Sequence, residues 1–182
     1  LYHVSYGIVL LPEGKMKSRE GTVIDADDIM DETTALAEKE VRARYSDLAE
    51  KEIKKRAESI ALGAIKFFMV KSDAIRDIVF NPAESLHFEG ETGPYLQYTH
   101  ARACSVLRKA GALRGTIDYS LLKEPSENTL LSLIETFPEV IRDAAAHSRL
   151  HVLCRYVLDL AQAFNEFYHC CPIISEEKPL MR

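Results

Sequence analysis

Hydrophobic residues recur with two different periods along the chain. In the segment YHVSYGIVLL, which starts at residue 2, alternate positions are apolar. These positions are Val4, Tyr6, Ile8 and Leu10. A period of two is typical of a half-buried strand, so the sequence predicts an extended chain over residues 2–10. Pro12 and Gly14 then indicate a turn.

Two amphipathic helices are predicted after this turn. The segment VIDADDIMDETTALAEKEVRARY carries Asp25, Asp27 and Asp28 near its start, and acidic residues favour a helix N-terminus. Its apolar positions, at near-helical spacing, are Ile29, Leu36, Val41 and Tyr45. The segment DLAEKEIKKRAESIALGAIKFFMVKS has a wider apolar stripe, which consists of Ile53, Ala57, Ile60, Ala61, Ala64, Ile65 and Phe68. We expect the basic residues 54–56 on the solvated face of this second helix.

The second half of the chain predicts a connecting segment and then three helices. IRDIVFNPAESLHFEGETGP has short apolar runs interrupted by Asn81-Pro82 and two glycines, which favours a connection with a short hairpin and an internal boundary. Helical patterns follow in PYLQYTHARACSVLRKAG, PSENTLLSLIETFPEVIRDAAAHS and RLHVLCRYVLDLAQAFNEFYHCC. We expect Pro138 to break or kink the second helix and Pro172 to lie beyond the third. The core stripe expected on the first helix is Leu96, Ala103, Leu107 and Ala110.

The predicted fold class is therefore all-α, a helical bundle preceded by one short strand and a loop. With 182 residues, 47% of them hydrophobic, the chain is large enough to bury the core of one domain or of a domain with an appendage. No apolar run approaches the roughly 18 residues of a membrane span, so we expect no membrane and a cytoplasmic location. Because the chain begins without methionine inside an apparent strand, we expect it to be a piece of a longer protein.

Cysteine spacing gives no support to a metal site. The four cysteines are Cys104, Cys154, Cys170 and Cys171, and they form no CxxC pair. The neighbouring histidines have no standard zinc-ligand spacing, so we expect no metal and interpret the cysteines as free thiols. A thiol or metal protein that uses Cys170 and Cys171 is an alternative, which metal co-purifying with the protein would support.

A basic, hydroxyl-bearing loop follows the predicted strand in a chain whose net charge is −5. The loop reads GKMKSREG, and its hydrogen-bond donors are Lys15, Lys17, Ser18 and Arg19. The glycines at both ends supply hinges. Taken alone, a solvated polar hairpin is the simpler interpretation. The net negative charge argues against broad electrostatic capture of nucleic acid, but it permits a local basic face.

One face of the helix that starts near Tyr95 is the second functional candidate. At 100° per residue, Tyr95, Tyr98 and Arg102 fall within about one sixth of a turn. Two aromatic rings and a guanidinium on one face are what stacking on unpaired bases and contact with phosphate require. The alternative is that both tyrosines only pack against a neighbouring helix.

Three stretches of the chain together resemble the C-terminal half of a class I arginyl-tRNA synthetase. GKMKSREG resembles the Lys-Met-Ser-Lys-Ser signature loop of that family in the variant form of arginyl enzymes. GAIKFF with VFNPAESLHFEGETGPYLQYTHAR resembles the entry into the anticodon-binding domain, and HVLCRYVLDLAQAFNEFY resembles a later helix of that domain. The resemblance covers nearly the whole chain, and EGETGPYLQYTHAR is its most specific part.

The resemblance implies a catalytic role for the loop residues Lys15, Lys17, Ser18 and Arg19, and contact with ATP for Lys15 and Met16. When ATP activates an amino acid, negative charge grows on the departing pyrophosphate, and cationic and hydroxyl donors on a closing loop stabilise it. The family usually has serine directly after the methionine, where this chain has Lys17. The separate roles of Lys17 and Ser18 therefore stay open.

The resemblance also implies tRNA contact for Tyr95, Tyr98, Arg102 and Tyr168. It divides the chain into the end of a catalytic α/β domain (1–24), a helical connecting region (25–80) and a C-terminally truncated anticodon-binding domain (81–182). The bundle is then of the class Ia anticodon-binding type.

The resembled family attaches arginine to tRNA-Arg with ATP and Mg²⁺. The implied partners are tRNA-Arg, ATP and arginine in the full-length protein, with no DNA, no bound cofactor in this fragment and a monomeric state. Because the nucleotide-binding fold and the arginine pocket lie outside these residues, we expect this part alone to be inactive. The alternative is a non-catalytic helical RNA-binding or protein-interaction module derived from such an enzyme.

Overall fold

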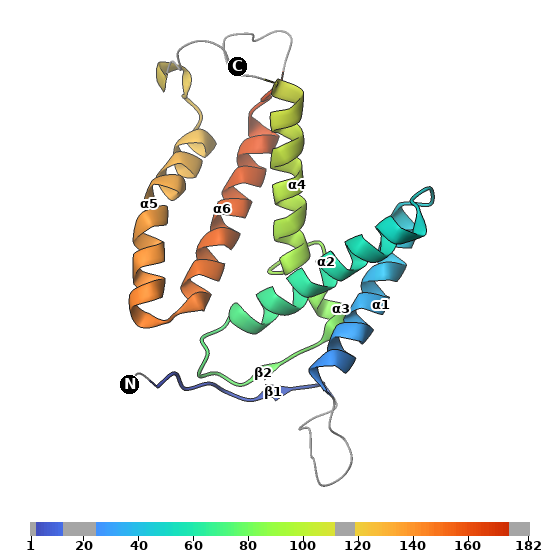
Figure 1. Ribbon diagram of the computed structural model, residues 1–182. Helices are drawn as coiled ribbons and strands as arrows, with labels where there is room; N and C mark the ends of the chain where they lie inside the picture. Colours follow the sequence, from blue (N-terminus) through green and yellow to red (C-terminus); the bar gives the residue numbers. More distant parts are fainter. Residues whose placement is uncertain (1–2, 13–24, 112–118, 175–182) are drawn as a thin grey trace.

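The computed structural model describes residues 3–12, 25–111 and 119–174, and within them it is an assembly of six α-helices with one two-stranded sheet (Figure 1). The helices are α1 (Ala26–Arg44), α2 (Glu50–Val70), α3 (Pro82–Ser85), α4 (Gly93–Ala110), α5 (Pro125–His147) and α6 (Leu150–Cys170). The strands are β1 (Val9–Leu10) and β2 (Ile78–Val79), and a 3₁₀ turn covers Tyr119–Leu121. The all-α prediction is confirmed.

The helices form two groups. Helices α1 and α2 make an antiparallel hairpin, while α4, α6 and α5 stand side by side across it with α6 in the middle (Figure 1). The N-terminal end of α4 packs on α2, and this contact joins the two groups of helices. None of the helices in the described ranges combines the length and apolarity that crossing a membrane requires.

Small residues let α1 and α2 pack closely. The buried cluster between them and α3 is Ala37, Ala57, Ala61, Ala64 and Leu86. Alanine side chains are short, so the helix axes approach each other and bury their backbones. The predicted apolar stripe of the second helix is thus confirmed, and Lys54 and Lys55 are exposed as expected, whereas Arg56 is partly buried.

A second cluster joins the sheet to the helices. Leu11, Ile29 and Phe80 are its buried members, and Val9 packs against them together with residues of α2. Phe80 has no exposed surface and meets Phe68 edge to face, with ring centroids 5.1 Å apart. Because β2 leads directly into Phe80, this core holds β1 and β2 together.

The predicted short strand is confirmed, but its expected buried face is wrong. Within residues 3–12 the strand covers Val9–Leu10, and the apolar positions Val4, Tyr6 and Ile8 are 49%, 86% and 54% exposed. Val9 and Leu11, the odd-numbered positions, face the core. Strand β1 pairs in parallel with β2, so the expected local hairpin in residues 75–94 is wrong. Its partner lies almost 70 residues away, and the register that turns the odd positions inward comes from that pairing.

Helix α4 buries only part of the core stripe that was expected. Leu107 is 67% exposed, whereas Leu96, Ala103 and Ala110 are partly buried and Thr99 is buried. The reason is that α4 contacts α2 near its N-terminus and α6 along its length, so the face that carries Thr99 is the one that meets a neighbour.

Pro138 does not break α5, which runs continuously from Pro125 to His147. Proline removes one backbone donor from a helix and leaves carbonyls upstream of it without their usual partners. Nearby, the Tyr156 hydroxyl of α6 donates to the Leu133 carbonyl at 2.9 Å. The rings of Tyr156 and Phe137 lie 5.7 Å apart, so α6 supports α5 beside the proline. Burial raises the pKa of Tyr156.

Candidate nucleic-acid interface

The start of α4 is fixed by its own sequence. Thr92 caps the helix, because its hydroxyl accepts a hydrogen bond from the Tyr95 backbone N–H at 3.2 Å, and Pro94 fits the first turn. Gly93 lies directly against α2, where a Cβ on it would overlap the Gly63 carbonyl. The segment TGPY therefore sets both the beginning of α4 and its packing contact with α2. This contact fixes the positions of the tyrosines on α4.

The four residues predicted to bind tRNA lie together. Tyr95, Tyr98 and Arg102 come from α4 and Tyr168 from α6. The Arg102 guanidinium carbon lies 4.7 Å from the Tyr98 ring centroid and 4.9 Å from that of Tyr168. One cation thus contacts two aromatic rings on neighbouring helices, an arrangement that attraction between a cation and a π face stabilises.

Asn165 of α6 joins this cluster and was not predicted from the sequence. Its Oδ1 accepts a hydrogen bond from Arg102 Nη1 at 2.6 Å. Its Nδ2 lies 2.9 Å from the Tyr95 hydroxyl and 3.0 Å from Thr99 Oγ1, and donates to both. Arg102 Nη2 donates to the Tyr98 hydroxyl at 2.7 Å. The available signal was an amide one helical turn before Tyr168.

The hydrogen-bond partners that orient the Arg102 guanidinium are uncharged. Within the described part of the chain, no carboxylate lies within ion-pair distance of this guanidinium, which instead contacts Asn165 and Tyr98. A cation oriented by neutral partners keeps its full attraction for an anion such as phosphate. This is the electrostatic requirement that a phosphate contact makes.

The tyrosines differ in how much surface they present. Tyr98 is 49% and Tyr168 39% exposed, whereas Tyr95 is partly buried with its hydroxyl bonded to Asn165. The two interpretations of the tyrosines, base stacking and packing against a neighbouring helix, therefore apply to different residues. Tyr98 and Tyr168 have ring surface available for stacking, and Tyr95 packs within the α4–α6 contact.

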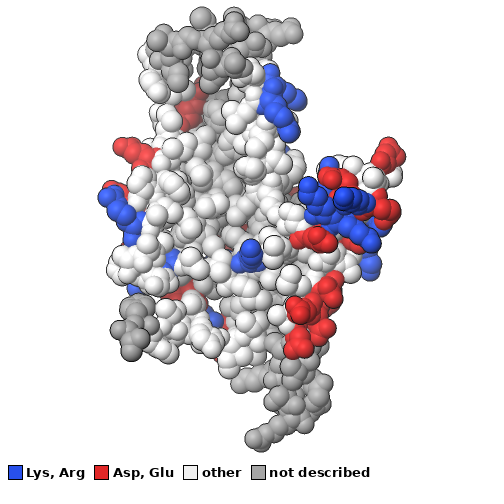
Figure 2. Space-filling view, viewed as in Figure 1, with Lys and Arg blue, Asp and Glu red and all other residues white. Residues whose placement is uncertain are grey.

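A groove of about 680 Å³ opens beside the cluster. Its lining includes Tyr98, Arg102 and Lys109 of α4, Tyr168 of α6 and Tyr45 at the end of α1. Figure 2 shows basic side chains beside the C-terminal end of α4, where Arg108 and Lys109 form the last turn. The local basic face that the sequence permits is thus present at this end of α4.

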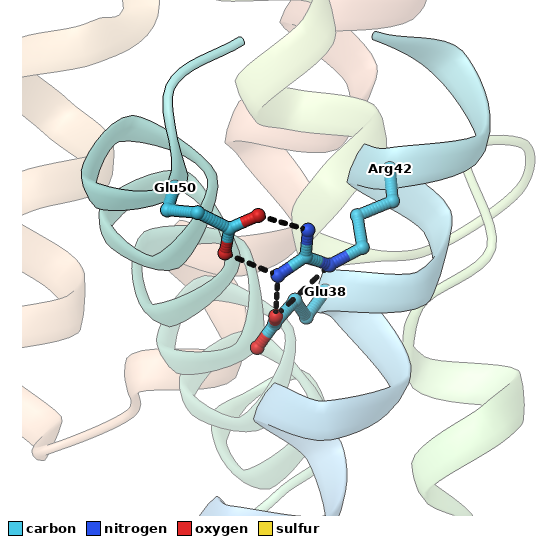
Figure 3. A network of polar contacts seen from close by, with 3 residues as sticks. All are labelled: Glu38, Arg42 and Glu50. Carbon is cyan, nitrogen blue, oxygen red and sulfur yellow. Dashed lines mark hydrogen bonds and ion pairs between the residues drawn. The ribbon is translucent and has the colours of Figure 1, made fainter. Parts of the chain in front are cut away.

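The tip of the α1–α2 hairpin carries mixed charges (Figure 2). Arg42 of α1 donates to both carboxylate oxygens of Glu50 on α2 at 2.6 Å, and its Nε donates to Glu38 at 3.1 Å (Figure 3). The hydrogen bonds that Arg42 donates hold the pKa of Glu50 below its usual value, and the same bonds to Glu50 and Glu38 raise the pKa of Arg42. This network joins the two helices where the chain turns.

The cysteines have no common site. Cys170 is exposed, whereas Cys171 is buried beside Ser126, with 3.7 Å between sulfur and hydroxyl oxygen. Partial burial raises the pKa of Cys154. Over residues 3–12, 25–111 and 119–174, no group of three or more His, Cys, Asp or Glu is placed to hold a metal ion.

The basic loop lies outside the described residues. This concerns Lys15, Met16, Lys17, Ser18 and Arg19. Their assignment to ATP and to catalysis stays a prediction.

Comparison with known proteins decides the family. Residues 1–82 match the family model of the class I (R) tRNA synthetase catalytic domain, and residues 96–182 match that of the DALR anticodon binding domain. The chain belongs to the class I arginyl-tRNA synthetase family. It corresponds to the C-terminal portion of these synthetases.

Relatives and solved structures agree with each other. The arginine–tRNA ligases of Flavobacterium psychrophilum and Treponema denticola are both 45% identical over 97% of this chain, which spans 30% and 31% of their lengths. The Thermus thermophilus arginyl-tRNA synthetase structure matches 99% of the chain with a TM-score of 0.85 at 37% identity, using 31% of that protein. The Plasmodium falciparum arginyl-tRNA synthetase gives 0.76 at 26% identity. The chain thus spans about a third of these synthetases.

Proposed function

We propose that the full-length protein attaches arginine to tRNA-Arg at the expense of ATP, and that this portion binds the anticodon region of the tRNA. The observation that carries the proposal is the cluster of Arg102 between Tyr98 and Tyr168, two half-exposed rings from separate helices. The relatives are arginine–tRNA ligases, and the second half of the chain matches an anticodon-binding domain.

The cluster has the chemistry that single-stranded RNA needs. Every base has a π face that stacks on tyrosine, and the unpaired bases of an anticodon loop are free to do so. Tyr98 and Tyr168 are the stacking residues in this proposal. Arg102 binds a backbone phosphate, because the uncharged groups that orient its guanidinium do not cancel its charge. Tyr95 acts less directly, as part of the α4–α6 contact that positions the others.

The loop residues serve the activation of arginine in this proposal. Lys15 and Met16 contact ATP, and Lys15, Lys17, Ser18 and Arg19 supply donors for the negative charge that grows as pyrophosphate leaves. Magnesium would accompany the ATP phosphates as part of the substrate. We further propose the division at residues 24 and 80, a monomeric protein and a cytoplasmic location.

Aminoacylation by the full-length protein tests this function. The protein is incubated with ATP, mixed tRNA and each amino acid in turn, and the acid-precipitable charged tRNA is counted. We expect charging with arginine, and none with the other amino acids. Charging with a different amino acid would overturn the assignment, and tRNA binding without any charging would favour the non-catalytic module.

A further inference from the structure

A third exposed tyrosine lines the same groove as Tyr98 and Tyr168. It is Tyr45, the residue at the C-terminal cap of α1, and it is 50% exposed. It comes from the α1–α2 hairpin, whereas the other two come from the upright helices. Tyrosines from both groups of helices therefore line this groove.

The position of Tyr45 is well supported. Its backbone N–H donates to the Val41 carbonyl at 3.0 Å and ends α1. The Arg56 guanidinium of α2 lies 5.4 Å from its ring centroid, and Glu52 accepts a hydrogen bond from Arg56 Nε at 2.9 Å. The contact with Arg56 favours one orientation of the ring and so lowers the entropy lost when a ligand orders it.

Tyr45 and Tyr98 together also line a second hollow, of about 300 Å³. The charged residues of this hollow are Arg44, Arg56 and Glu40, all from the hairpin. The two rings thus stand where the hollows meet, and the recess continues from α6 to the tip of the hairpin. A chain bound at Tyr98 has a path toward Tyr45.

The charge of the larger groove favours an anionic occupant. Among the described residues that line it, Arg102 and Lys109 are charged and there is no carboxylate, although the whole chain has a net charge of −5. Aromatic walls with cations at their edges are the features by which proteins hold unpaired nucleotides. A volume of about 680 Å³ lies within the range that binds small ligands, so it admits more than a single ring.

We propose that Tyr45 stacks on an unpaired nucleotide of the bound tRNA, a different nucleotide from those held by Tyr98 and Tyr168. The hairpin then supplies one wall of the RNA site and the anticodon-binding helices the other. This inference rests on the proposed tRNA binding, to which it adds a residue and a second point of contact.

Loop scanning of the RNA tests the proposal. The full-length protein and its Tyr45→Ala, Tyr98→Ala and Tyr168→Ala variants are titrated with tRNA-Arg transcripts, each carrying one abasic nucleotide in the anticodon loop. Tyr119→Ala is the matched control, because Tyr119 is 68% exposed and lines neither hollow. Tyr45→Leu keeps an apolar side chain beneath Arg56, so it separates stacking from packing if the alanine variant folds poorly.

We expect Tyr45→Ala and Tyr45→Leu each to weaken binding of the intact transcript roughly 5- to 150-fold, the range of one base-stacking contact. For one abasic transcript, the Tyr45 variants and the parent should bind equally well. The abasic position in that transcript should differ from the positions at which Tyr98→Ala and Tyr168→Ala bind like the parent. If both Tyr45 variants bind like Tyr119→Ala while the other two lose affinity, the inference is wrong and the proposed function stands. An equal loss for every transcript would also contradict stacking. If Tyr98→Ala and Tyr168→Ala have no effect, the tRNA site proposed at this cluster fails.

Discussion

Arg102 of α4 and Asn165 of α6 are joined by a hydrogen bond of 2.6 Å from Nη1 to Oδ1, although 63 residues separate them in the chain. The bond orients the guanidinium between two tyrosine rings without neutralising it. The amide group of Asn165 serves two of the three candidate side chains of α4, because its nitrogen donates to Tyr95 at the same time. The contact between α4 and α6 and the candidate RNA site are therefore one structure.

Asn165→Asp separates orientation from charge. The carboxylate still accepts from Arg102, and the Tyr95 and Thr99 hydroxyls are able to donate to it, so we expect a melting temperature close to that of the parent. The new negative charge competes with phosphate for Arg102, so tRNA affinity should fall roughly tenfold, or about 1.4 kcal/mol. Binding titrations and thermal melting of the full-length protein measure both. Unchanged affinity in a folded variant would mean that Arg102 does not meet the RNA backbone.

Arg102→Ala should reduce the salt dependence of tRNA binding as well as the affinity. Removing one contact to an RNA phosphate lowers the slope of log affinity against log salt concentration by about 0.7. Arg155→Ala is the matched control, because Arg155 lies on α6 and is engaged by Asp159 and Glu91. We expect the control to keep the parent's slope. A slope that stays the same in Arg102→Ala would remove phosphate contact from its role.

Lys15→Ala and Arg19→Ala should slow arginine activation in the full-length protein. Their contacts tighten as pyrophosphate leaves, so we expect kcat to fall more than KM for arginine rises. Exchange of labelled pyrophosphate into ATP, with tRNA present, measures the step. Parent-like rates in both variants would reduce the loop to a surface turn.

The Arg42–Glu50 pair gives the hairpin a dependence on pH. Because Arg42 lowers the pKa of Glu50, the ionised carboxylate stabilises the folded state above the usual glutamate pKa of 4.5, and this contribution is lost as the pH falls through the lower folded-state value. Glu50→Gln lacks it. The variant should therefore melt slightly lower than the parent at pH 7, by a small amount because the pair is exposed, and the gap should close as the pH falls through the lowered folded-state pKa of Glu50. A gap that is constant from pH 7 to pH 3 would contradict an ionic contribution.

The helices were predictable from the sequence because each depends on its own periodicity. The stripe from Ile53 to Phe68 predicts α2 regardless of its neighbours. The β1 register was not predictable, since Val9 and Leu11 turn inward only through pairing with β2 and packing near Phe80. Residues 9–11 are all apolar, so the sequence alone does not show whether the odd-numbered or the even-numbered residues face a core formed far away in the chain.

The candidate site was predictable in part for the same reason. Helical spacing places Tyr95, Tyr98 and Arg102 on one face of α4, and the structure keeps them together. Asn165 was missed because its role arises from the register between α4 and α6, which no local pattern encodes. Leu107 was misassigned because α2 meets α4 near its N-terminus, and an apolar residue near the other end of α4 stays exposed.

The most direct test of tRNA binding at this cluster is the affinity of the full-length protein for tRNA-Arg when Tyr98 or Tyr168 is replaced by alanine. Each replacement should cost about 1–3 kcal/mol of binding free energy, because one stacking surface is lost. The melting temperature should stay near that of the parent and of Tyr119→Ala, since both rings are substantially exposed. Parent-like tRNA affinity together with a large drop in melting temperature would show that the tyrosines only pack the helices, and would contradict the account.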